Sequence, residues 1–389
     1  MAEEVWMLQT KKADFKQIGA RFRIDPVTAR IIRNRGIEGE AAIDRYLNGT
    51  LDDLYDPMLL KDMKRAVSIL CEAVDTGKKI RIVGDYDIDG VCSTYILLQA
   101  FERLGSDVDF EIPDRIKDGY GINESIIEQA HADGVEVILT CDNGISAFHQ
   151  VELAKKYGMT VVITDHHEVP LDGEKEKIPP ADAVIDPKQA DCPYPFPEIC
   201  GAVVAYKLVQ VLYARRGVPQ MEWLDLLEFA AIATVGDVMK LQDENRILVK
   251  YGLKKMAQTK NLGLRRLAEK NNLDLGAITA YHIGFVIGPC LNAGGRLKTA
   301  KEALALLRAQ SEEEAERLAE ELKELNDTRK DMTEQGTEAA KLQVESWYQK
   351  DKVLVVFLPE CHESLAGIIA GRLREYYQKP AIVLTRGEE

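Results

Sequence analysis

The sequence has no apolar run that approaches the length of a bilayer span and no cysteine spacing typical of a structural site. Its seven cysteines are an odd number without CxxC pairs, which argues against a disulfide framework and a zinc cluster. The first residues, MAEEVWMLQTKK, carry acids where a signal peptide needs a basic region, and no apolar stretch follows them. We therefore expect a cytoplasmic protein with reduced thiols and no membrane partner.

Positive charge is also scarce. The 389 residues include 50 Lys and Arg against 64 Asp and Glu, which gives a net charge of −14. This balance argues against a generally basic coat for nucleic acid, because phosphate contacts normally come from clustered Lys and Arg. It leaves open a local basic groove, and also a carboxylate cage that attracts phosphate after binding cations. The length predicts two domains.

From Lys79 onward, short apolar runs alternate with helix-length segments. The runs are IRIVGD, VDFEIP, VEVILTCD, TVVITD and ADAVID. Strands that alternate with helices indicate a parallel sheet, and continuous apolar runs fit strands buried on both faces. We therefore predict an α/β fold. Its parts are a helical lead-in over 1–78, a parallel-sheet domain over 79–300, a connecting helix over 301–350 and a partial second α/β domain over 351–389.

Acidic residues stand at the ends of four of these runs, at Asp85, Asp142, Asp165 and Asp186. The carboxyl edge of an open parallel sheet is where ligands bind. A single aspartate at a strand end often does no more than cap the next helix. Four of them at one predicted edge favour a functional site.

The segment IVGDYDIDG places Asp85, Asp87 and Asp89 at alternate positions between a strand and a helix. An extended backbone would put all three on one side. Carboxylates held so close repel one another unless cations lie between them. A D-x-D-x-D-G run also resembles the start of a calcium loop, but that loop needs Glu at its twelfth position, which here is Ile96.

Three further segments add ligands of the same kind. LTCDNGIS contributes Asp142, VITDHHE contributes Asp165, His166 and His167, and ATVGDVM contributes Asp237 in an apolar context. An oxygen-rich set with imidazole favours manganese or magnesium over a zinc site. Carboxylates and histidine from separate strands are what a two-metal hydrolytic centre needs. No phosphate-binding Gly-rich loop, G-x-S-x-G elbow or Cys-His nucleophile pattern competes with this interpretation.

Taken together, these motifs resemble the DHH phosphoesterase superfamily, and within it the RecJ-type single-strand-specific 5′→3′ exonucleases. The likeness covers nearly the whole chain and includes IIRNRGI, GDYDIDG, YGIN, TCDNG, VITDHHE, VIDPKQADCPYPF, CGAVVAYKL, ATVGDV, GPCLNAGGRL and HESLAGIIAGRL. GDYDIDG together with TDHH is typical of the superfamily. LNAGGRL points to the RecJ branch.

The resemblance implies a role for each site residue. It makes two ions, Mn²⁺ or Mg²⁺, the cofactors, with Asp85, Asp87, Asp142, His166 and Asp237 as their ligands. It implies that His167 contacts the scissile phosphate, and that Asp89 and Asp165 are supporting carboxylates that orient the ligands. It also implies substrate contacts from Asn292, Gly295, Arg296, His362 and Arg372.

The sequence departs from the family pattern in two places: Cys290 stands where Arg is common, and Glu363-Ser364 replaces a common Pro-Gly. The pattern also continues beyond TRGEE into an OB-fold, so we expect this chain to hold long strands weakly.

The resemblance implies a hydrolase that shortens single-stranded DNA from its 5′ end to mononucleotides by a two-metal mechanism. One alternative is a phosphodiesterase for short oligonucleotides or cyclic dinucleotides. Another is a non-catalytic DNA-binding replication scaffold, which would be expected to lack some of the metal-site carboxylates. Single-stranded DNA is the expected partner. Helicases or single-strand-binding proteins as further partners stay open.

Overall fold

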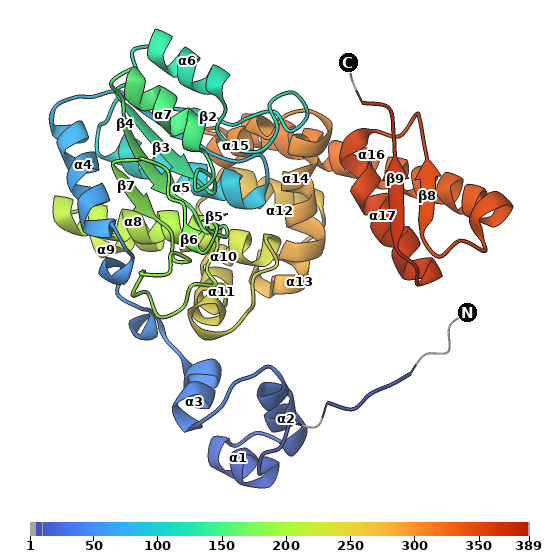
Figure 1. Ribbon diagram of the computed structural model, residues 1–389. Helices are drawn as coiled ribbons and strands as arrows, with labels where there is room; N and C mark the ends of the chain where they lie inside the picture. Colours follow the sequence, from blue (N-terminus) through green and yellow to red (C-terminus); the bar gives the residue numbers. More distant parts are fainter. Residues whose placement is uncertain (1–4, 10, 388–389) are drawn as a thin grey trace.

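The computed structural model describes residues 5–9 and 11–387. It has a large central lobe built on a parallel sheet, a small helical module before it and a separate C-terminal unit after a long helix (Figure 1). The predicted α/β class with a parallel sheet is confirmed. Within the described ranges, no helix combines the length and the apolar content needed to cross a membrane.

The central sheet has five parallel strands in the order β2-β1-β3-β4-β7. Register pairs Val83 with Thr140 and Thr140 with Ile163, so β1, β3 and β4 end at one edge. The chain runs from β1 outward to β2 and then crosses to β3, so the strand order reverses between β1 and β3. Such a switch point opens a crevice at the carboxyl edge. The strands are β1 (Ile80–Val83), β2 (Val108–Glu111), β3 (Val137–Cys141), β4 (Thr160–Thr164) and β7 (Ala183–Ile185).

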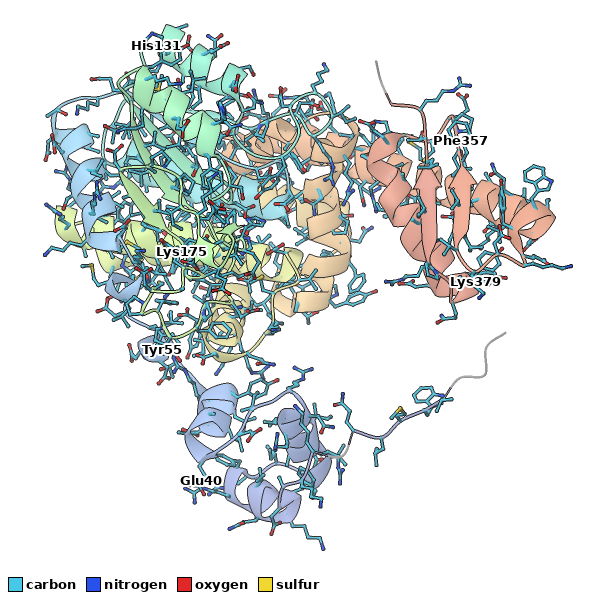
Figure 2. All side chains as sticks on the ribbon, viewed as in Figure 1. Glu40, Tyr55, His131, Lys175, Phe357 and Lys379 are labelled. Carbon is cyan, nitrogen blue, oxygen red and sulfur yellow. The ribbon has the colours of Figure 1, made fainter. Side chains whose placement is uncertain are left out.

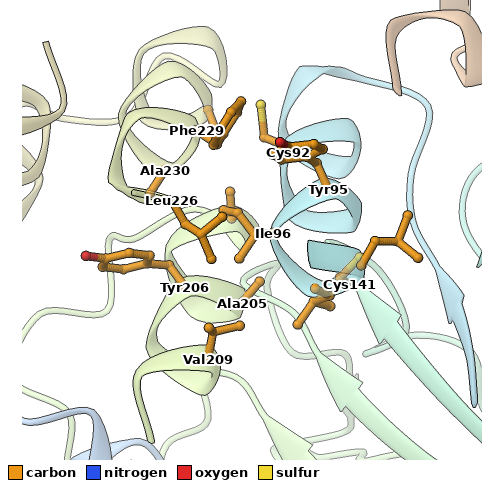
Figure 3. Packing of buried hydrophobic residues seen from close by; sticks show 14 of the residues in the cluster. Cys92, Tyr95, Ile96, Cys141, Ala205, Tyr206, Val209, Leu226, Phe229 and Ala230 are labelled. Atoms are coloured by element: carbon orange, nitrogen blue, oxygen red, sulfur yellow. The ribbon is translucent and has the colours of Figure 1, made fainter. Parts of the chain in front are cut away.

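Helices cover both faces of the sheet, as continuous apolar strands require. Ile82 and Leu139 point into the larger core with α4 (Met63–Asp75), α5 (Ile88–Arg103), α8 (Gly201–Arg216) and α10 (Leu227–Gly236). In this core, Ile96 of α5 lies near Ala205 of α8 and Leu226 at the start of α10 (Figure 3). The smaller core lies under α6 (Glu124–Ala132) and α7 (Phe148–Lys156).

The rest of the central lobe is mainly helical. Its helices are α9 (Gln220–Leu224), α11 (Asp243–Met256), α12 (Leu262–Lys270), α13 (Ala280–His282), α14 (Gly288–Leu297) and α15 (Lys301–Arg308). A π-helical segment (Ile283–Ile287) joins α13 to α14, and a short hairpin is formed by β5 (Leu171–Asp172) and β6 (Lys175–Glu176).

The N-terminal module consists of α1 (Phe15–Phe22), α2 (Pro26–Asn34) and α3 (Glu40–Asn48), which enclose a small core of their own. It is tied to the central lobe by polar contacts. Arg45 Nε of α3 lies 3.3 Å from Asp243 Oδ1, and Arg246 donates to the Tyr46 carbonyl at 2.6 Å. Tyr55 (Figure 2), which follows the module, donates from its hydroxyl to Asp243 at 3.0 Å. The division at residue 78 stays a prediction; α4 packs into the larger core of the central lobe.

The C-terminal unit follows the 32-residue helix α16 (Glu312–Gln343), which Ser311 caps as its side chain accepts from Glu314 N–H. A π-helical turn (Val344–Tyr348) leads to β8 (Leu354–Phe357), α17 (Glu363–Tyr377) and β9 (Ala381–Leu384). The two strands are parallel. Leu354 and Val356 are buried under α16 and α17, whereas Phe357 (Figure 2) lies on the outer side of the sheet.

The buried side chain of Glu228 on α10 allows the cost of a charge in the central core to be measured. It is 3% exposed; its Oε1 accepts from the Thr259 hydroxyl at 2.7 Å, and its Oε2 has no hydrogen-bond partner among the described residues. Burial raises the pKa of Glu228 to about 7 from 4.5. The fold therefore favours the protonated form, and this stabilisation is complete below pH 4.5 and is lost as the pH rises through 7.

We expect Glu228→Gln, which keeps the shape without the charge, to be more stable than the unchanged protein at pH 8, by roughly 2–3 kcal/mol. At pH 5 the difference should shrink. Urea unfolding at both pH values measures it. Thr259→Val is the control, because it removes the hydrogen bond and keeps the carboxyl. If Glu228→Gln changed the free energy of unfolding equally at both pH values, Glu228 would not titrate in this range.

Candidate active site

The first group of candidate ligands gathers at the carboxyl edge of the sheet, beside the switch point. Asp85 follows β1 and Asp142 follows β3. Asp87 caps α5, because one of its oxygens accepts from the backbone N–H groups of the first turn at 2.9 and 3.1 Å. Carboxylate oxygens of Asp85, Asp87 and Asp142 lie within 4.8 Å of one another. The structure thus brings together three predicted ligands from two strand ends.

A second group adjoins the first through His166, which follows β4. Its Nε2 lies 3.0 Å from Asp142 Oδ1 and 3.8 Å from Asp237 Oδ2. Asp237 reaches this position from the C-terminal end of α10, where it is the C-cap residue. All five residues predicted as metal ligands therefore line one site at the carboxyl edge of the sheet.

Asp89 does not lie where the alternate spacing predicts. The backbone is not extended through it, because α5 already begins at Ile88. The Asp89 side chain turns toward α8, and its two oxygens accept from the N–H groups of Gly201 and Ala202, each at 2.7 Å. This carboxylate therefore caps α8, and it still lies 3.4 Å from His166 Nε2.

Asp142 is held in an unusual backbone conformation. Its φ is +62°, in the left-handed region that side-chain-bearing residues rarely adopt. The first residue of α8, Gly201, lies so close that a Cβ there would stand 2.7 Å from the Cβ of Asp142. Only glycine allows this approach without a shift of the backbone. The fold thus presses the N-terminus of α8 against this carboxylate.

The pKa values show how costly the charges are at this edge. Burial, with the charge of Asp87, raises the pKa of Asp85 to about 7. Burial, with the charges of Asp89 and Asp87, raises the pKa of Asp237 to about 7 and that of Asp142 well above its ordinary value. For His166, burial lowers the pKa, which favours the neutral imidazole that binds metals.

These residues fit a divalent cation. Asp85 Oδ1 is buried without a hydrogen-bond donor among the described residues, although a buried carboxylate oxygen normally has one. The donors are carboxylate oxygens and one imidazole nitrogen, the chemistry that suits Mn²⁺ or Mg²⁺. A cation would offset the repulsion that raises these pKa values.

His167 has a different environment from its neighbour. Its Nδ1 lies 2.8 Å from Asp165 Oδ1. Burial works against a charged ring, but the hydrogen bond and charge of Asp165 outweigh burial and raise the pKa of His167 to about 9. Asp165 also accepts from the N–H groups of His166 and Ile145 at 2.7 and 2.9 Å. Asp165 therefore contacts both histidines, and its role as a supporting carboxylate stays a prediction.

Tyr120 is a site residue that the sequence reasoning did not single out, although it lies in the YGIN motif. Its hydroxyl donates to the Asp142 carbonyl at 3.0 Å and lies 3.0 Å from His167 Nδ1. Its ring packs edge-on against the His167 ring. Tyr120 thus links the backbone of Asp142, a candidate metal ligand, to the ring of His167.

Arg296 borders a cavity of about 470 Å³ that also includes Arg115 and, from the C-terminal unit, Ser364. Burial, followed by the charges of Arg115 and Arg329, lowers the pKa of Arg296. None of these three arginines forms an ion pair with a carboxylate in the described part of the chain. We call this cavity the arginine groove; Glu363 also belongs to its lining, and Arg329 lies outside the lining but close enough for its charge to reach Arg296. Arg115 and Arg329 were not predicted.

The two predicted substrate residues of the C-terminal unit, His362 and Arg372, have different surroundings. His362 Nδ1 lies 2.8 Å from Ser364 Oγ, which donates to the Arg296 carbonyl at 3.0 Å, so His362 is linked to the arginine groove. Arg372 lines a neighbouring groove with glutamates of α16 and α17, although its charge still reaches Arg329.

The other two predicted substrate residues, Gly295 and Asn292, lie on α14. Gly295 is buried, and a Cβ there would stand 2.3 Å from the Tyr86 carbonyl, so it lets α14 approach the turn that carries Asp85 and Asp87. Asn292 has a buried Oδ1 without a partner among the described residues. Their substrate contacts stay predictions.

Comparison with known proteins agrees with this geometry. The family model for the DHH family, N-terminal domain, matches residues 79–234. A crystal structure of exonuclease RecJ bound to manganese is 33% identical, with a TM-score of 0.74, and the match covers 84% of this chain and 80% of that one. The chain belongs to the RecJ family. The resemblance inferred from the motifs is confirmed.

Further RecJ relatives extend the match to almost the whole chain. The single-stranded-DNA-specific exonuclease RecJ of Bacillus subtilis (strain 168) is 37% identical over 99% of this chain, which spans 48% of that protein. RecJ of Escherichia coli (strain K12) is 35% identical, over 92% of this chain and 63% of its own length. RecJ of Thermus thermophilus in complex with Mn²⁺ has a TM-score of 0.80 at 30% identity, with coverage of 95% and 52%. The chain thus spans about half to two thirds of these curated relatives.

The cluster of carboxylates around His166 can be tested by its effect on stability, without an activity assay. Without metal, Asp142→Asn should raise the unfolding temperature, because it removes the charge of a fully buried carboxylate from a repulsive cluster. Manganese should raise the unfolding temperature of the unchanged protein, since a ligand at 100 times its Kd adds about 2.7 kcal/mol. It should raise that of Asp142→Asn much less.

Thermal unfolding in chelator and in manganese measures both effects. Asp331→Asn, an exposed carboxylate on α16, is the matched control and should respond to manganese like the unchanged protein. A full manganese response in Asp142→Asn would remove Asp142 from the metal site.

Proposed function

We propose that this chain is a metal-dependent exonuclease that hydrolyses single-stranded DNA, with two Mn²⁺ or Mg²⁺ ions held by Asp85, Asp87, Asp142, His166 and Asp237. The observation that supports it most directly is the buried cage of repelling carboxylates around His166, beside an arginine groove. Membership in the RecJ family supports the substrate class. On the same ground we propose attack from the 5′ end, release of mononucleotides and a cytoplasmic location.

The cations, when bound, would lower the pKa of a water molecule and polarise the scissile phosphate. His167, held protonated by Asp165, would donate a hydrogen bond from Nε2 to a phosphate oxygen. Tyr120 would keep the His167 ring facing the cage. Asp89 would hold Asp142 in place by capping α8, the helix packed against it.

The arginine groove would take the phosphates next to the one being cleaved. Arg115 and Arg296 have no carboxylate partner among the described residues and lie close enough for their charges to interact. Guanidinium groups bind phosphate in a bidentate manner, and an anion between them would offset their mutual repulsion. One wall of the cavity is Ser364, which belongs to the C-terminal unit, so both parts of the chain would contact the substrate.

The decisive experiment uses single strands labelled at either end, with manganese or with chelator. Mononucleotides should appear from the 5′ end only, in manganese only, and a blunt duplex should stay intact. Asp87→Asn should lose at least about 10³-fold in rate. Cleavage of only di- and trinucleotides would instead support the short-oligonucleotide alternative, and strand binding without any cleavage would support the scaffold.

Arg296→Gln should mainly raise KM, because it removes a phosphate contact made in both ground state and transition state. We expect roughly a tenfold effect on kcat/KM. Arg65→Gln, an exposed arginine of α4 without an ion pair in the described residues, is the matched control. An unchanged kcat/KM in Arg296→Gln would place the substrate phosphates elsewhere.

Tyr120→Phe should lower kcat by roughly 10-fold, because it removes the Tyr120 contact and leaves the Asp165 hydrogen bond alone to orient the His167 ring. KM for the strand and the manganese response of the unfolding temperature should stay the same. Single-turnover rates and thermal unfolding measure these quantities. A loss of manganese binding would instead mean that Tyr120 acts through Asp142, whose carbonyl it also contacts.

A further inference from the structure

The N-terminal module has a charge opposite to that of the rest of the chain. Between Lys11 and Arg35 there are eight basic and two acidic residues, in a protein with a net charge of −14. Both acids are helix caps: Asp14 accepts from Gln17 N–H, and Asp25 accepts from Val27 and Thr28 N–H. The two acids are therefore occupied by backbone groups of α1 and α2.

Several of the basic side chains have no acidic partner. Of the eight, Arg21 pairs with Glu40 and Arg33 with Glu38, while the other six form no ion pair with a carboxylate in the described part of the chain. Five of those six lie where the start of α1 meets the end of α2. We call these five the N-terminal basic patch: Lys11, Lys12, Lys16, Arg30 and Arg35.

Contacts hold the patch together. Lys11 Nζ donates to the carbonyl of Asn34 in the last turn of α2, at 3.2 Å. The Arg30 guanidinium lies 4.5 Å from the ring centre of Phe15, at the start of α1. Lys12 and Lys16 flank Phe15 in the sequence and are exposed. Cations near the end of α2 also suit its macrodipole, but this effect does not account for Lys12 and Lys16, which lie before and on α1.

The patch is fixed next to the proposed metal centre. Gln242 Nε2 donates to the Arg35 carbonyl at 2.8 Å. Gln242 follows Asp237, one of the proposed ligands, by five residues, so the chain between them spans at most about 18 Å. The first residue of that segment, Val238, is 87% exposed. The proposed metal centre and the patch therefore lie at the two ends of one short segment, which is exposed at Val238 and Lys240.

The charge distribution favours a single strand over a duplex. Two helices joined by the short turn Arg23 to Asp25 could suggest a major-groove reader, in which the N-terminal end of the second helix contacts bases. In α2 that end carries the Asp25 carboxylate, which would repel phosphates, and the cations lie at the other end. A flexible single strand needs only a track of cations along its backbone.

We propose that the N-terminal basic patch binds the phosphates of single-stranded DNA that extends beyond the metal centre, over the segment from Asp237 to Gln242. This inference deepens the proposed function and rests on it for the identity of the strand. The patch would act in holding the strand and would not take part in hydrolysis.

The test compares Lys11→Gln/Lys12→Gln/Lys16→Gln with a control that changes charge equally, Lys64→Gln/Lys156→Gln/Lys254→Gln. All three control lysines are exposed and form no ion pair with a carboxylate in the described residues. Affinity for a labelled single strand of about 30 nucleotides is measured in chelator across a salt series, so that it does not depend on cleavage. The patch variant should bind roughly tenfold more weakly at moderate salt, and the slope of log K against log salt should fall by about 2.

Cleavage in manganese gives the second measurement. A dinucleotide has one internucleotide phosphate, which the metal centre would hold, so its kcat/KM should be the same in both variants and the unchanged protein. The long strand should lose kcat/KM in the patch variant only. The proposal is overturned if affinity and salt slope match those of the control variant, or if only duplex affinity falls. Absence of cleavage by the unchanged protein would contradict the proposed function, while the chelator measurements would still decide whether the patch binds DNA.

Discussion

Both oxygens of Asp89 accept backbone N–H groups from the first turn of α8, and this cap organises the carboxylate-rich edge of the lobe. The partial positive charge of a helix N-terminus partly offsets the negative charge that the cluster concentrates there. The same contact brings Gly201 against Asp142, which is strained at a φ of +62°. The interaction thus joins α5, α8 and the loop after β3 before any cation is bound.

Much of this arrangement could be predicted from the sequence, since the carboxyl ends of parallel strands meet at one edge. Asp85, Asp142 and His166 follow the first, third and fourth of the apolar runs, and the structure places them together. The alternate spacing of Asp85, Asp87 and Asp89 was less informative. It carries no signal for where α5 begins, and a start at Ile88 turns Asp89 toward α8.

Other site residues depend on tertiary packing that no local pattern describes. Arg115 comes from the loop after β2 and Arg329 from the middle of α16, so their approach to Arg296 depends on how α16 packs on α14. Tyr120 lies in the YGIN motif, and nothing in that motif indicates that its hydroxyl reaches Asp142, 22 residues away at the end of β3. Arg372 lies on α17 in a groove that also contains glutamates of α16 and α17, and nothing in the motif HESLAGIIAGRL indicates this position.

The helix α16 has a mechanical consequence for the arginine groove. With 32 residues it is about 48 Å long, and it carries the C-terminal unit at its far end. Its first half is buried against the central lobe at Leu318 and Leu322, whereas Gly336 and Ala340 in its second half pack on the C-terminal unit. One wall of the groove, at Ser364, belongs to the carried unit, whereas Arg296 belongs to the central lobe. One continuous helix therefore sets the distance between the two walls of the groove, and any change in that distance requires α16 to bend or to slide on the surface that it shares with α12 and α14.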